Sequence, residues 1–97
     1  MTAITIGNSA GTSTEMITKI VRSALKREHA LLERSLNKTE AHLRGYEQRY
    51  RFSSEIFFQR YQNGELDDRN DHIDWAGEYQ IYLSIREQLD CLAEVTV

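Results

Sequence analysis

Apolar side chains recur every three or four residues along most of the chain, which is the spacing of an amphipathic α-helix. The first series contains no proline and no glycine before Gly45. Its members are Ile17, Ile20, Val21, Ala24, Leu25, Leu31, Leu32, Leu36, Thr39, Leu43, Tyr46 and Tyr50. The series predicts one helix over about residues 14–50, which would be roughly 55 Å long at 1.5 Å per residue.

A short second helix is predicted directly after the first. Ser53 has the features of an N-cap, and Phe52 and Phe57 stand on either side of it in the positions of a hydrophobic staple. Gly64 is typical of the residue that follows the last turn of a helix. These signals together predict a helix over about residues 54–62.

A third helix is predicted in the last part of the chain. Asn70 or Asp71 can act as its N-cap, and apolar residues then recur at helical spacing. They are Ile73, Trp75, Ala76, Tyr79, Tyr82, Leu83, Ile85, Leu89 and Leu92. The predicted helix covers about residues 71–94 and is roughly 34 Å long.

The first 13 residues have a different composition from the rest. Thr2, Ile4 and Ile6 favour an extended chain, and glycine and serine follow them. We expect a flexible or strand-like N-terminal arm over 1–13 and a single helical domain over 14–97. A chain of 97 residues and 11.3 kDa has room for one hydrophobic core only.

The order long helix, short helix, long helix predicts an all-α fold in which the two long helices form an antiparallel hairpin. Their unequal lengths would leave about 20 Å of the first helix uncovered. Its apolar side chains would form a large patch in water, so we expect self-association, with a symmetric dimer forming a helical bundle or coiled coil as first choice. Coverage by the N-terminal arm, or fraying of the helix end, is the alternative. The expected interface residues are Ile17, Ile20, Val21, Ala24, Leu25 and Leu32.

Charge is distributed unevenly along the chain. Up to Arg51, nine lysines and arginines stand against five acids, a net charge of +4, whereas the remainder has three arginines, ten acids and a net charge of −7. This asymmetry indicates an electrostatic match between the two arms of the hairpin, or between the basic arm and an acidic partner. Lys19, Arg22 and Lys26 share one helix face, so a nucleic-acid contact is conceivable, but a solvated face is simpler and the net charge of −3 disfavours nucleic acid.

All nine aromatic residues lie between Tyr46 and Tyr82. The simpler interpretation is a core where the short helix packs on both long ones. A partner-binding surface is the alternative, because tyrosine and tryptophan are enriched in such surfaces. Phe57 and Phe58 are adjacent and cannot both face inward, so one of them is a candidate exposed anchor.

The sequence shows no pattern for catalysis, a metal or a cofactor. Asp67 to Glu78 has the length of a calcium loop, but Arg69 and His72 stand where a ligand and a glycine are required. The histidines are scattered, so no nucleophile is paired with a base, and we expect a non-enzymatic protein. One cysteine, no signal peptide and no membrane-spanning stretch lead us to expect a cytoplasmic location without membrane association.

The stretch from Tyr50 to Tyr79 carries a family resemblance. It reads YRFSSEIFFQRYQNGELDD, followed by an Asp-Trp pair, and is similar to a pattern YxMSSEEFYxxFxxGELxDDxDFxEWxxxY of small uncharacterised prokaryotic helical proteins. The chain departs from this pattern at Arg51-Phe52 before Ser53, at Ile56, which replaces a usually acidic residue, and at His72-Ile73 before Asp74. Such proteins are often associated with toxin–antitoxin-like loci, so the resemblance, over about a third of the chain, implies an antitoxin or accessory role.

We therefore predict a non-catalytic helical protein–protein interaction module, antitoxin-like, whose acidic C-terminal half masks a basic partner such as a toxin. Two alternatives stay open, namely a small DNA-binding regulator that uses the basic first helix and a structural coiled-coil adaptor. A ribbon-helix-helix regulator would need a break that the stretch from Glu15 to Leu43 lacks. The expected partner-binding residues are Phe57, Phe58, Tyr61, Glu65, Asp67, Asp68, Asp71, Asp74 and Trp75.

Overall fold

The computed structural model describes residues 12–95, which form three α-helices and no strand. The helices are α1 (Thr12–Tyr50), α2 (Ser54–Gln62) and α3 (Asn70–Ala93). The all-helical class and the long–short–long order are confirmed, and every helix begins and ends within two residues of its predicted position. Residues 1–11 of the predicted N-terminal arm lie outside the described residues, and the last two residues of that arm belong to α1.

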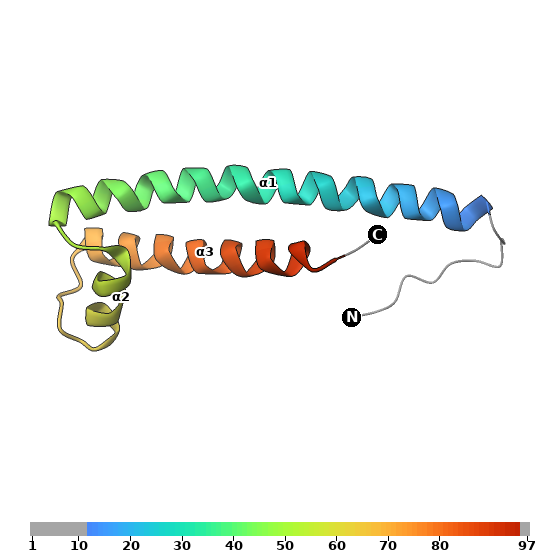
Figure 1. Ribbon diagram of the computed structural model, residues 1–97. Coiled ribbons are helices and arrows are strands. Elements are labelled where there is room, and N and C mark those ends of the chain that lie inside the picture. Colours follow the sequence, from blue (N-terminus) through green and yellow to red (C-terminus); the bar gives the residue numbers. More distant parts are fainter. Residues whose placement is uncertain (1–11, 96–97) are drawn as a thin grey trace.

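The two long helices lie side by side and run in opposite directions (Figure 1). Arg49 pairs with Asp71, and His42, seven residues earlier, pairs with Glu78, seven residues later. This antiparallel register places the end of α3 level with about residue 27 of α1. The first 16 residues of α1 therefore extend beyond α3 by about 24 Å. The molecule is accordingly elongated, with principal extents of 60 × 22 × 20 Å.

The core lies at the closed end of the hairpin, where the three helices meet. Phe57 of α2 and Trp75 of α3 are 0% exposed, and their rings stack with centroids 3.8 Å apart and an interplanar angle of 4°. Leu43 and Ala76 complete the buried centre. The aromatic residues that pack around it are Tyr46, Tyr50, Phe52, Phe58, Tyr61, Tyr79 and Tyr82. All nine aromatic residues thus gather at this end, as the core interpretation predicts.

Both ends of α2 follow the predicted signals. The Ser53 hydroxyl accepts a hydrogen bond from the backbone N–H of Ile56 at 3.2 Å, so Ser53 is the N-cap. The rings of Phe52 and Phe57 lie 6.3 Å apart, which completes the hydrophobic staple. At the other end Gly64 adopts a left-handed conformation with φ 73°, a backbone geometry that ends a helix.

The start of α3 differs from the prediction. Arg69 is the N-cap, in place of Asn70 or Asp71, and its side chain makes no capping hydrogen bond. The Asp71 carboxylate instead accepts hydrogen bonds from the Tyr50 hydroxyl at 2.6 Å and from Arg49 at 2.7 Å. The carboxylate that was a candidate cap therefore joins the first turn of α3 to the last turn of α1.

The turn after α1 offers a test of backbone strain. Arg51 has φ 66°, a conformation that costs a residue with a side chain about 1–2 kcal/mol. We expect Arg51→Gly to raise the free energy of unfolding by about 1 kcal/mol in urea denaturation. Gly64→Ala, whose methyl group would meet no atom within 4 Å, should lower it by a similar amount through φ alone. Unchanged stability in both variants would contradict this account.

Candidate functional site

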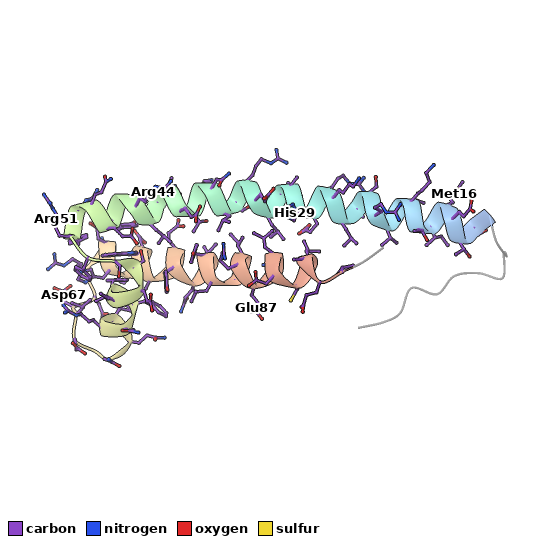
Figure 2. All side chains as sticks on the ribbon, viewed as in Figure 1. Met16, His29, Arg44, Arg51, Asp67 and Glu87 are labelled. Atoms are coloured by element: carbon purple, nitrogen blue, oxygen red, sulfur yellow. The ribbon has the colours of Figure 1, made fainter. Side chains whose placement is uncertain are left out.

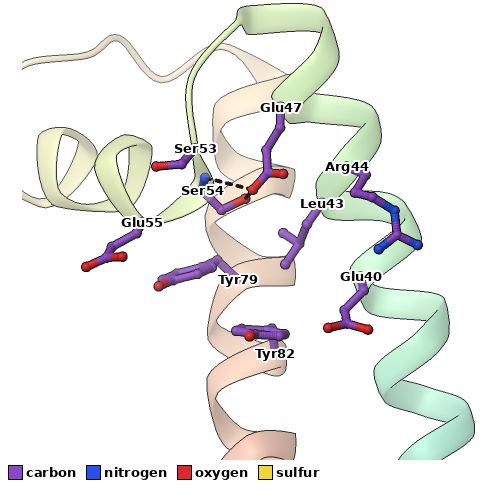
Figure 3. Close-up of a pocket in the computed structure, with 9 residues that line it drawn as sticks. All are labelled: Glu40, Leu43, Arg44, Glu47, Ser53, Ser54, Glu55, Tyr79 and Tyr82. Atoms are coloured by element: carbon purple, nitrogen blue, oxygen red, sulfur yellow. Dashed lines mark hydrogen bonds between the residues drawn. The ribbon is translucent and has the colours of Figure 1, made fainter.

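A hollow of about 300 Å³ opens where α2 meets the two long helices (Figure 3). Each of the three helices contributes to its wall, so the hollow exists only when the hairpin is closed and α2 is packed. The residues that line it are Glu40, Leu43, Arg44, Glu47, Ser53, Ser54, Glu55, Tyr79 and Tyr82. It combines acidic and aromatic side chains in one concave surface.

Two tyrosine rings of α3 form one side of this hollow. Tyr79 and Tyr82 lie three residues apart, on one face of the helix, and their rings stack with centroids 5.8 Å apart and an angle of 21°. The Phe58 ring of α2 packs on Tyr79 at 5.1 Å. These contacts fix the orientation of the rings, so the hollow presents a preformed aromatic surface.

Three carboxylates surround the tyrosine rings. Glu40 and Glu47 are seven residues apart on α1 and share one helix face, and Glu55 comes from the first turn of α2 (Figure 3). The single basic residue of the lining is Arg44. Burial raises the pKa of Tyr79, and the negative charges of Glu55 and Glu47 raise it further. The three carboxylates and one arginine give the hollow a negative potential, and the raised pKa keeps the Tyr79 phenol neutral.

A buried hydrogen-bond chain holds the three helices around the hollow. Ser54, which is 3% exposed, donates to the Glu47 carboxylate from its backbone N–H at 2.9 Å and from its hydroxyl at 2.7 Å. The Trp75 indole N–H donates to the same hydroxyl at 2.9 Å. The chain joins α1, α2 and α3 through one serine, so it positions α2 and the Glu55 carboxylate.

The aromatic part of the predicted partner-binding surface is corrected by the structure. Phe57 and Trp75 are completely buried, so neither can contact a partner while the helices are packed. Phe58 and Tyr61 are half-buried and pack against the same core. Of the two adjacent phenylalanines, Phe57 points inward and Phe58 lies at the edge, because a helix turns about 100° per residue.

Two of the acidic residues in that predicted surface already have partners within the chain. Asp67 pairs with Arg69 at 3.0 Å, and the hydrogen bonds from Arg69 lower the pKa of its carboxyl to about 2. Hydrogen bonds from Tyr50 and Arg49 likewise lower the pKa of Asp71. These two carboxylates are thus engaged within the chain. Asp67 is nevertheless exposed, like Glu65, Asp68 and Asp74, whereas Asp71 is half-buried.

Most of the predicted self-association residues lie on the part of α1 that α3 leaves uncovered (Figure 2). Ile20 is 59% exposed and Ala24 is exposed, whereas Ile17, Val21 and Leu25 are half-buried. Leu32 is different, because it is 8% exposed and lies between α1 and α3. It belongs to the interior of the hairpin and contributes only a small edge to the surface.

The three basic residues considered for nucleic acid are brought together by the structure. Lys19, Arg22 and Lys26 are exposed and lie three and four residues apart on α1. They therefore share one solvent-facing side of the helix extension, away from the hollow at the closed end. This geometry fits a solvated face as well as a contact surface.

Sequence reasoning did not single out the residues of the hollow. The separation of seven between Glu40 and Glu47 places them on one helix face and was an available signal. The spacing does not indicate the partner of Glu47, whose carboxylate accepts hydrogen bonds from Ser54 of α2. No sequence pattern places Glu55 in the hollow, because its position depends on how α2 packs across the hairpin.

Comparison of the chain with models of protein families, with curated proteins and with solved structures gives no match. Within residues 12–95, none of the helices combines the length and apolar character needed to cross a membrane. The same residues contain no group of three or more histidine, cysteine or acidic side chains that is arranged to hold a metal ion. The function is therefore inferred from the chemistry of the hollow and of the surface.

Proposed function

We propose that this protein is a non-catalytic helical interaction module that binds a basic protein partner, with the hollow receiving an arginine or lysine side chain. The observation that supports this is the arrangement of three carboxylates, Glu40, Glu47 and Glu55, around the stacked rings of two tyrosines. A carboxylate forms charge-assisted hydrogen bonds with a guanidinium or ammonium group, and a tyrosine face attracts the same cation. Arginine suits the site better than lysine, because its planar guanidinium group can stack on a tyrosine ring and pair with a carboxylate at the same time.

The charge of the surrounding surface supports a basic partner as well. The chain after Arg51 carries a net charge of −7, and Glu65, Asp68 and Asp74 are exposed on it. Such a surface steers a basic partner toward the molecule and disfavours acidic competitors. The family resemblance is compatible with an antitoxin-like form of this role, in which the acidic half covers the basic RNA-binding surface of a toxin.

A peptide titration tests the hollow directly. A short arginine-containing peptide should shift the NMR signals of Tyr79, Tyr82 and Glu55 in a saturable manner. The double variant Glu40→Gln/Glu55→Gln should bind this peptide about tenfold more weakly, a loss of about 1.4 kcal/mol, because two ion-pair partners are removed while the shape is kept.

The matched control for this titration removes the same charge elsewhere. Glu65→Gln/Asp68→Asn changes two exposed acids of the loop and should weaken the peptide only slightly, through the long-range field. Equal weakening by the two double variants would show that net charge, and not the hollow, binds the peptide. Signals of the hollow that do not move would contradict the proposed site.

A gel-shift experiment with the same protein tests the DNA-binding alternative. A gel shift of duplex DNA at low salt that is lost when Lys19, Arg22 and Lys26 are replaced by glutamine would favour a regulator that uses the α1 extension. Peptide binding at the hollow without such a shift would favour the interaction module. A structural adaptor would bind neither probe and would use only the apolar side of α1.

A further inference from the structure

A second row of apolar side chains runs along α1 outside its contact with α3. Ile17, Ala24 and Leu31 follow one another at intervals of seven residues, with Ile20 between the first two. Leu31 is 53% exposed although α3 extends to its level, and its neighbour Leu32 is buried. A repeat of seven is the spacing of side chains along the seam of a coiled coil, so this row fits against another helix.

A second feature lies beside this row, in a shallow hollow of about 470 Å³ between α1 and the last turns of α3. Leu32, Cys91 and Leu92 give it an apolar surface, and the carboxylates of Glu28 and Glu87 also line it. This hollow lies beside the last turns of α3. A helix from another molecule that packs along the apolar row of α1 would therefore also cover it.

We infer that a second copy of this chain covers both features, with the two α1 helices crossing in antiparallel fashion at Ala24. Positions 17 and 31 lie seven residues on either side of position 24, so Ile17 of each copy meets Leu31 of the other. Ala24 then meets its own counterpart, and its small side chain permits close approach of the two helices. Ile17 and Ile20 of each copy also reach the apolar hollow of the other.

Charge and shape favour the antiparallel arrangement. Residues 12–27 contain four basic residues and one acid. The last turns of α3 and its C-cap contain Glu87, Asp90 and Glu94 against Arg86. Antiparallel pairing at Ala24 brings residues 15–22 of one copy level with the acidic end of α3 in the other, although Arg22 of one copy also comes level with Lys26 of the other. Parallel pairing would instead align every basic residue with its own counterpart and bring no acidic segment beside them. α2 lies at the far end of the hairpin and leaves the crossing free (Figure 1). This dimer uses a surface separate from the hollow of the proposed function.

A disulfide trap tests the register of the dimer. Oxidation of the double variant Ala24→Cys/Cys91→Ser should produce a covalent dimer, because the two copies of position 24 are adjacent at the crossing. The control is Lys26→Cys/Cys91→Ser, which places the thiol on the opposite side of the same helix turn and should form no covalent dimer on oxidation. Equal cross-linking of the two variants would overturn the proposed register.

Sedimentation equilibrium over a range of micromolar concentrations tests the association itself. The wild type should approach twice its mass of 11.3 kDa, and Ile20→Asp should weaken the dimer at least about tenfold, because it buries an unpaired charge in both halves of the contact. Ile20 is largely exposed in the single chain, so unchanged helicity by circular dichroism would show that the variant folds.

Two results would overturn the proposal. One is a mass of 11.3 kDa at every concentration. The other is a monomer that dimerises only after residues 1–11 are deleted, because this result would assign the cover of the apolar row to the N-terminal segment of the same chain. Both outcomes are independent of peptide binding, so they leave the proposed function to its own experiment.

Discussion

Replacing Trp75 with alanine is expected to lower the free energy of unfolding by about 3–5 kcal/mol, the cost of removing a large buried aromatic side chain. Trp75 is 0% exposed and stacks on Phe57, and its ring also packs against Tyr46, Tyr50 and Phe52. A protein of this size is stable by only about 5–15 kcal/mol, so the variant should lose much of its stability. Urea denaturation followed by far-ultraviolet circular dichroism measures the loss.

The control for this experiment is on the same helix. Ile81 is also a large apolar residue of α3, but it is 51% exposed, so Ile81→Ala should cost less than about 1 kcal/mol. A similar loss of stability in the two variants would mean that the aromatic core does not dominate the fold. A large loss for Trp75→Ala alone would place most of the packing energy at the closed end.

The second large effect is expected from Ser54→Ala, which should cost about 2–3 kcal/mol. The change leaves the buried indole N–H of Trp75 without an acceptor and removes the hydroxyl that donates to Glu47. The indole N–H is enclosed, because Trp75 is 0% exposed, so water cannot replace the lost acceptor. Denaturation of the variant, together with a double-mutant cycle that combines it with Glu47→Gln, measures how strongly the serine and the carboxylate are coupled.

Ser53 provides a neighbouring comparison. Its hydroxyl caps α2 at the surface, so Ser53→Ala should cost about 1 kcal/mol, the usual value for loss of an N-cap. If Ser53→Ala destabilised the protein as much as Ser54→Ala does, the chain through Glu47, Ser54 and Trp75 would contribute no more than an ordinary cap. The hydrogen-bond chain would then not be the element that holds the helices together.

The helices were predictable because each one is specified by residues that are close in sequence. Apolar spacing marks α1 and α3, and Ser53 and Gly64 mark the two ends of α2 through local hydrogen bonds and φ. The uncovered length of α1 follows from simple arithmetic on the helix lengths. The collection of aromatic residues near the hairpin turn likewise required only their positions in the chain.

The site was not predictable, because it depends on how the helices are rotated and packed. Asp71 has the sequence features of a helix cap, but Tyr50 and Arg49 lie close enough in space to use its carboxylate. Glu55 joins the acidic hollow only because α2 folds across the other two helices.

The antiparallel register also has a consequence for the order in which the chain folds. The pair of Arg49 and Asp71 is separated by 22 residues, and the pair of His42 and Glu78 encloses it with a separation of 36. Contacts between the long helices are nested in this way, so each one formed near the turn shortens the loop that the next must close. We therefore expect the contacts between the long helices to form first at the aromatic end and then outward from it. The α1 extension is the last part of the molecule to be stabilised.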